Sequence, residues 1–162
     1  MVATTIANVL QTLQSAVVDI LRADVNSLTF THRDNSTDGT SLSSQHILDG
    51  VPTGLQRGEG FPYIIVHTPE MDETWLTLRK QKIELNVHVE IIDRMEQNVR
   101  ILTDGVRKSM STNNSVLQSD GYWLFGRRIR TNLNYVFLPG ELGMKPVWHM
   151  NMFFTFLWTG LR

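Results

Sequence analysis

The chain has 162 residues, of which 41% are hydrophobic and 19% charged, with a formal net charge of −1. This length and composition predict one globular domain over residues 1–162, able to bury roughly two-thirds of the surface of the unfolded chain. The sequence contains no cysteine, which excludes disulfides, thiolate metal sites and thiol nucleophiles. The near-neutral charge argues against binding of nucleic acid through bulk electrostatics.

Membrane insertion and export are not expected from the hydropathy pattern. No apolar run approaches the ~20 residues that a membrane-spanning helix needs. The N-terminus has neither the basic region nor the long apolar segment of a signal peptide. We therefore expect a soluble, unexported chain.

The first predicted element is an amphipathic helix that begins at Thr4 or Thr5 and ends near Arg22. Its apolar residues repeat at helical spacing. They are Ile6, Val9, Leu10, Leu13, Val17, Ile20 and Leu21. We expect this stripe to pack on a sheet, and a partner-binding helix is the alternative.

After a short predicted strand at residues 28–30, the composition of the chain changes over residues 31–60. They are rich in Thr, Ser, Asn, Asp and Gly, with one weak apolar island. A loop of this length in a compact domain is usually functional or disordered. We interpret it as an extended polar arm that orders against a neighbouring molecule, and a mobile surface loop is the alternative. The candidate partner-binding residues of the arm are His46, Ile47, Leu48 and Val51.

A strand is predicted at residues 63–67 because Pro62 suits a strand start and Pro69 ends it. Residues 71–80 then form either the first half of a long hairpin or a projecting loop, and we favour the hairpin. Residues 82–91 (KIELNVHVEI) alternate strictly between polar and apolar, which predicts a strand with one dry and one wet face.

A second helix follows this central strand directly. Asp93 and Glu96 have the spacing of a capping box. A stripe at intervals of three and four comprises Met95, Val99, Leu102, Val106 and Met110. A wet-faced strand joined to such a helix predicts an α+β fold, a mainly antiparallel sheet with two amphipathic helices packed on one face and the polar arm in addition.

The C-terminal part of the chain returns to strand character. Residues 111–115 (STNNS) predict a turn, and residues 119–121 predict another before the strand at 122–125. An alternating strand from Ile129 ends at Pro139. The last strand, 147–158, carries six large side chains on one face, each worth roughly 1.5–3 kcal/mol when buried. We therefore expect it near the middle of the sheet.

Phe153 and Leu157 make the other face of the last strand partly apolar, so we expect a neighbouring subunit to cover that face. On the wet face of the central strand, Glu84, His88 and Glu90 share one side, and His149 can face them from another strand. These residues suit either acid–base or metal chemistry or, as we favour, a hydrated or interfacial polar surface. We expect no cofactor.

Charge is unevenly distributed along the chain. Residues 120–162 carry five basic and two acidic residues, a balance of +3, which leaves −4 on residues 1–119. Arg127, Arg128 and Arg130 follow three aromatic residues, a combination also found where proteins bind single-stranded nucleic acid. We favour contact with carboxylates of a neighbouring subunit, with phosphate contact as the alternative.

The order of elements resembles the tail terminator, or tail completion, proteins of long-tailed phages, the lambda-like family. The resemblance lies in the first helix, the polar arm, FPYIIVHTPE, KIELNVHVEIID joined to the second helix, and HMNMFFTFLW. It implies a small α+β subunit of the virion, made in the host cytoplasm and placed at the head-proximal end of the tail.

The resemblance further implies a homohexameric ring without catalytic residues. Such a ring stops polymerisation of the tail tube protein, provides the docking surface for the head connector or neck protein, and meets DNA only as passing cargo. Two alternatives stay open: a head-completion or neck protein of the same virion, and a small α+β enzyme or ligand-binding domain.

Overall fold

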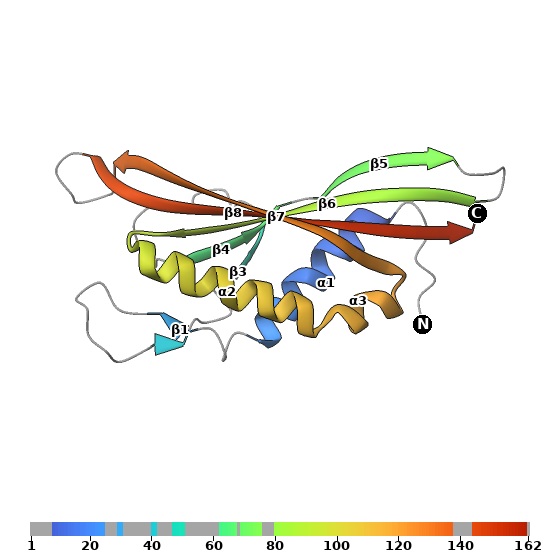
Figure 1. Cartoon of the computed structure of the whole chain (residues 1–162), viewed down its shortest axis with the longest axis horizontal. Helices are drawn as coiled ribbons and strands as arrows, with labels where there is room; N and C mark the ends of the chain where they lie inside the picture. The colour runs from blue at the N-terminus through green and yellow to red at the C-terminus, as the bar shows by residue number, and fades with distance from the viewer. Residues whose placement is uncertain are drawn as a thin grey trace.

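A six-stranded sheet with helices on one side forms the framework of the chain (Figure 1). The computed structural model describes residues 8–24, 29–30, 40–41, 47–50, 62–67, 69–75, 80–137 and 144–161. The strands of this sheet are β3 (Ile47–Asp49), β4 (Tyr63–Val66), β5 (Glu70–Trp75), β6 (Lys80–Asp93), β7 (Tyr122–Phe137) and β8 (Met144–Leu161). The helices α1 (Val9–Ala23), α2 (Glu96–Thr112) and α3 (Asn114–Ser119) confirm the predicted α+β class.

The strand order is β3-β4-β6-β8-β7, and every pairing except β3 with β4 is antiparallel. β4 pairs with residues 89–92 of β6, whereas β5 pairs with residues 81–86. These two short strands therefore share one edge of β6, and the predicted hairpin of β5 and β6 is confirmed. β8 lies between β6 and β7, which confirms its predicted place inside the sheet.

The dry faces of β6 and β8 meet the helices. All five apolar residues of the β6 pattern, from Ile83 to Ile91, are 0% exposed. Phe154 and Phe156 of β8 are at most 1% exposed and belong to the same core as Val99, Leu102, Val106 and Met110 of α2. From α1, the buried residues are Val9, Leu13, Val17, Val18, Ile20 and Leu21. The expected start of this helix at Thr4 or Thr5 lies outside the described residues.

Two details around α2 differ from the sequence prediction. The capping box does not form, because α2 begins at Glu96 with Met95 as its N-cap residue. The Asp93 carboxylate instead accepts hydrogen bonds from the amide of Arg94 and the side chain of Asn98, both at 2.6 Å. The predicted turn at residues 111–115 is also wrong, because α2 continues to Thr112 and α3 follows after Asn113. The Asn113 side chain donates hydrogen bonds to the Ser109 carbonyl and to Asp24. These polar contacts end α2 at a single residue, without a loop before α3.

The segment predicted as a polar arm, residues 31–60, contains two short strands, β2 (Thr40–Ser41) and β3, and the predicted strand at 28–30 corresponds to β1 (Thr29–Phe30). β1 pairs with β2 in a separate two-stranded sheet, and β3 adds to the main sheet beside β4. α1 holds β3 in place, because Gln14 bonds Asp49 and Arg22 donates to the carbonyl of Ile47. No helix within the described ranges is long and apolar enough to cross a membrane.

Candidate functional site on the polar face of the sheet

The face of the sheet opposite the helices has a row of polar side chains along β6 and β8. Residues that stand opposite each other in antiparallel strands share a face. The register therefore places Asn86 beside Thr155, His88 beside Phe153 and Glu90 beside Asn151. No described helix packs on this side (Figure 1). We call this surface the polar face.

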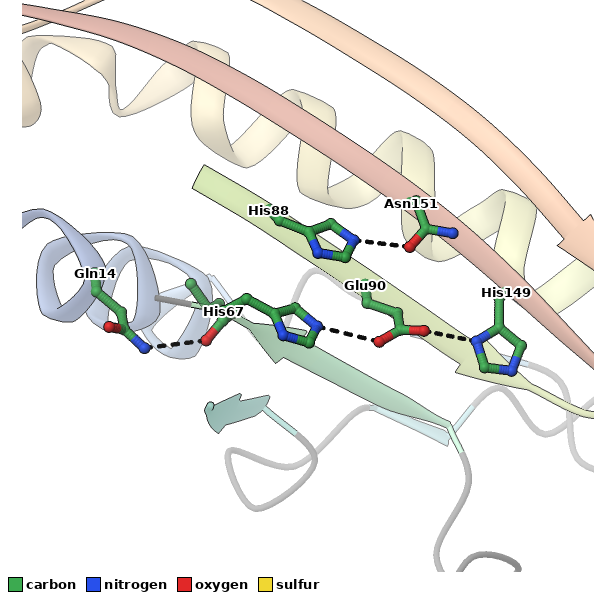
Figure 2. A network of polar contacts seen from close by, with 7 residues as sticks. Gln14, His67, His88, Glu90, His149 and Asn151 are labelled. Atoms are coloured by element: carbon green, nitrogen blue, oxygen red, sulfur yellow. Dashed lines mark hydrogen bonds and ion pairs between the residues drawn. The ribbon is translucent and has the colours of Figure 1, made fainter. Parts of the chain in front are cut away.

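Glu90 is the centre of a hydrogen-bond network on the polar face. One carboxylate oxygen accepts a bond of 2.6 Å from Nδ1 of His149, and the other accepts a bond of 3.1 Å from Nε2 of His67. Figure 2 shows the carboxylate between the two rings. The three residues come from β6, β8 and the residue that follows β4, so the network joins three strands.

These contacts fix the charge of Glu90. The hydrogen bond from His149 and then that from His67 lower the pKa of the Glu90 carboxyl from 4.5 to about 2, against the opposing effect of burial. Glu90 is thus ionised at neutral pH and holds no proton that it could donate as a general acid. Within the ranges described, no group of three or more His, Cys, Asp or Glu side chains is placed to hold a metal ion.

His88 forms a second group beside the Glu90 network. Its ring stacks on His67 with centroids 4.4 Å apart and on Phe153 with centroids 4.7 Å apart. Its Nε2 bonds the amide oxygen of Asn151 at 2.7 Å (Figure 2). A hollow of about 250 Å³ lies next to these rings, lined by His67, Glu70, Asn86, His88 and Phe153.

The other predicted residues of this face lie further along the sheet. Glu84 stands opposite Leu157 and pairs with Lys82 at 3.8 Å, where both side chains are 39% exposed. Neither Glu84 nor Leu157 takes part in the network around Glu90. The predicted residues of this face therefore form two groups. His88 and Glu90 belong to the hydrogen-bonded group, and Glu84 and Leu157 lie apart from it.

The three arginines of the predicted interface lie on β7 but do not share one face. Arg128 is opposite Phe153 and Arg130 is opposite Asn151, which places both on the polar face. Arg127 is opposite Phe154 and so lies on the helix side, where it reaches the hydroxyl of Ser111 at 3.4 Å. All three side chains are exposed.

The predicted partner-binding residues of the arm are only partly available to a partner. Ile47 is 0% exposed and belongs to the core, because parallel pairing with β4 turns it inward, so its side chain is not accessible to a partner in this structure. Leu48 is half-buried. His46 and Val51 lie outside the described residues.

Sequence reasoning did not place His67 and Asn151 in the site. The signal for His67 is its position directly after β4: continuing the antiparallel register of β4 with β6 sets it beside His88, whose carbonyl accepts the amide of His67 at 2.9 Å. That inference needs the strand order, which no local pattern supplies.

Comparison with known proteins defines the fold class of this chain. No family model matches the sequence, and no curated protein matches it. By structure, it is similar to a set of solved chains that share this α+β fold. One of these chains belongs to the virion of a native gene transfer agent (GTA) particle, with a TM-score of 0.54 and 15% sequence identity. The similarity covers 91% of this chain and 95% of that chain.

Proposed function

We propose that this chain is a structural protein of a phage-like virion and serves as its tail terminator. In this role identical copies form a ring, a hexamer by the resemblance of the sequence, at the head-proximal end of the tail. The ring stops polymerisation of the tail tube protein and presents a docking surface to the head connector or neck protein. DNA passes through it as cargo, and no catalytic step is involved.

The fold similarity to a chain of the GTA virion is the observation that carries this proposal, because it extends over nearly the whole of both chains. The element order of the terminator family supports it independently at the level of sequence. The polar face supports it physically: Phe153 and Leu157 remain partly exposed there, and an ionised, hydrogen-bonded Glu90 suits a fixed surface better than proton transfer.

Deletion of the gene from the phage or phage-like element that encodes it tests the function. We expect electron micrographs to show overlong tails and filled heads that are not joined, and expression of the wild-type chain from a plasmid to restore joined particles of normal length. Tails of normal length beside heads that leak or lack tails would instead identify a neck protein. Normal particles would contradict both functions.

The hollow beside His88 favours one further candidate, a ligand-binding domain. Its lining combines two imidazole rings, an amide, a carboxylate and an aromatic ring. A thermal-shift screen with small polar compounds tests this candidate, with His88→Leu as the matched control. A compound that raises Tm in the wild type but not in the variant supports ligand binding, and the absence of any such compound removes the candidate.

A further inference from the structure

Among the residues that the structure describes, three strands of the main sheet have an unpaired backbone edge: the short β3 and the longer β5 and β7. In this described part of the chain, β5 pairs only with β6, and β7 pairs only with β8. Proteins usually cover, blunt or use such edges, because free N–H and C=O groups template pairing with another chain. A bulge at Phe125 interrupts β7 near its start, but the register is regular from Gly126 onward. We call the surfaces of the two longer strands the β5 edge and the β7 edge.

The β5 edge has two acidic residues on one face and an exposed apolar residue, Met71, on the other. Glu70 and Asp72 stand opposite Asn86 and Glu84 of β6, which places both on the polar face, and both are exposed. Met71 stands opposite Leu85 on the helix side and is 37% exposed.

The β7 edge has the same arrangement with the opposite charge. Arg128 and Arg130 lie on the polar face, and both are exposed. Between them, Ile129 lies on the helix side and is 42% exposed although it is a large apolar residue. Across the width of the sheet, one face therefore runs from carboxylates to guanidinium groups, and the other has an exposed apolar side chain at each edge.

We propose that the β5 edge of one copy pairs antiparallel with the β7 edge of the next copy. The pairs are Glu70 with Arg130, Met71 with Ile129, and Asp72 with Arg128. This inference rests on the proposed ring and names its subunit contact. The charged pairs form on the polar face and the apolar pair forms on the helix side, so each side chain meets a complementary one.

The geometry of the sheet requires this direction and permits this register. β5, β6, β8 and β7 alternate in direction, so β7 of a neighbour in the same orientation runs antiparallel to β5. Within a strand, successive residues direct their backbone groups to opposite sides. Because of the registers of β5 with β6, β6 with β8 and β8 with β7, the outward-directed residues of β5 and β7 are either all even-numbered or all odd-numbered. The proposed pairs join residues of equal parity, so both faces and hydrogen bonds match.

The same charges disfavour pairing of like edges. Two β7 edges would bring arginines together, and two β5 edges would bring carboxylates together, and like charges directly opposite destabilise a strand pair. The contact is therefore heterologous, with a different surface from each partner. Contacts of that type propagate from copy to copy and close into a ring when the rotation allows it.

Cross-linking tests the proposed register, and a chain without cysteine is well suited to it. In the double variant Met71→Cys/Ile129→Cys, oxidation should produce covalent dimers and larger multimers on non-reducing gels. Within one chain the two positions are separated by β6 and β8, at least about 14 Å at the usual strand spacing, and Ile129 also lies further along the sheet than Met71. This separation is too large for a disulfide. The signal therefore arises only between copies.

The matched control is Met71→Cys/Arg128→Cys, in which the second cysteine lies on the other face of the same strand. It should give at most a tenth of the cross-linked product, as should each single variant. The experiment is done both on the purified chain and on assembled particles. Particles in which the Met71→Cys/Ile129→Cys chain stays monomeric after oxidation, or cross-links no better than the control, would overturn the proposal.

Charge reversal is a second test that does not depend on disulfide geometry. We expect Glu70→Arg/Asp72→Arg and Arg128→Glu/Arg130→Glu each to lower the yield of assembled particles at least tenfold, with circular dichroism spectra unchanged. The quadruple variant restores complementary edges and should recover assembly. Equal loss in the quadruple variant, despite an intact fold, would count against edge pairing.

Gene deletion and cross-linking together distinguish a failure of this contact from a failure of the proposed function. Overlong tails on gene deletion, together with no 71–129 cross-link in particles, would leave the terminator function standing and remove the edge pairing. A specific cross-link combined with normal tails on deletion would leave the edge pairing standing and remove the terminator function.

Discussion

At the scale of single residues, Glu90 shows how the polar face contributes to stability. Its pKa falls from 4.5 to about 2 on folding, because His149 and His67 bind the ionised carboxylate. A carboxyl with a lowered pKa stabilises the fold above its unfolded pKa, and this contribution is lost as pH falls through the folded pKa. The window of loss therefore runs from about pH 4.5 down to about pH 2, and the size of the effect is on the order of 2–3 kcal/mol.

We predict that Glu90→Gln lowers the free energy of unfolding by about 2 kcal/mol near neutral pH and by little near pH 2. Urea denaturation at several pH values measures the difference. Glu84→Gln is the matched control on the same strand and face, and it should change stability by less than about 0.5 kcal/mol because the Glu84 side chain is 39% exposed. An equal loss for Glu90→Gln at both ends of the pH range would contradict the assignment.

Phe154 and Phe125 provide a second matched comparison. Phe154 is 1% exposed on the dry face of β8, whereas Phe125 is 54% exposed at the bulge of β7. We expect Phe154→Ala to cost about 3–5 kcal/mol through lost burial and a new cavity. Phe125→Ala should stay within about 0.5 kcal/mol in the isolated chain. Thermal or chemical denaturation of the two variants side by side checks both values.

At the scale of elements, the turn between α3 and β7 depends on Gly121. This residue has φ +88, and a Cβ there would lie 3.2 Å from the indole of Trp158. Gly50 has φ +77 with nothing within 4 Å of the same position. Gly50→Ala should therefore cost about 1–2 kcal/mol from backbone strain alone.

Gly121→Ala should cost more than Gly50→Ala, by roughly 1–3 kcal/mol, because the Trp158 side chain must also move. The difference between the two variants isolates the steric part of the effect, and near-ultraviolet circular dichroism reports the environment of the tryptophan. Equal losses for both variants would show that the indole accommodates the methyl group freely.

The elements with a strict period were predictable from the sequence. The alternation in β6 and the stripe in α2 each follow from one local pattern, and their buried residues agree with it. The short elements were not predictable in this way. α3 is six residues long and begins among polar residues typical of turns, and its one buried residue, Leu117, gives no period.

The candidate site was predictable only in part for the same reason. Glu90 and His88 lie on one strand, so their common face follows from a period of two. Their partners His67 and Asn151 come from other strands, at a sequence separation of 23 and 63 residues. Only pairing between strands brings them together, and the register of that pairing cannot be found within any one segment.

At the scale of the whole molecule, the charge asymmetry noted in the sequence becomes an arrangement in space. The acidic and basic halves contribute the two opposite edges of one sheet, with Asp72 on β5 and Arg128 on β7. Sequence analysis treated the three arginines as one group, although the alternation of a strand already separates Arg127 from Arg128 and Arg130. The bulge at Phe125 decides which face each of them takes, and the sequence pattern alone did not locate that bulge.

The place of β8 also has a consequence for biosynthesis. This strand separates β6 from β7 in the sheet, yet the ribosome makes it after both. A nascent chain that stops before Met144 has β6 and β7 but lacks the strand that pairs with both of them. The apolar face of the sheet is then incomplete. Folding therefore waits for the last stretch to be translated, and a nonsense mutation upstream of β8 should yield an insoluble fragment in place of a shorter working subunit.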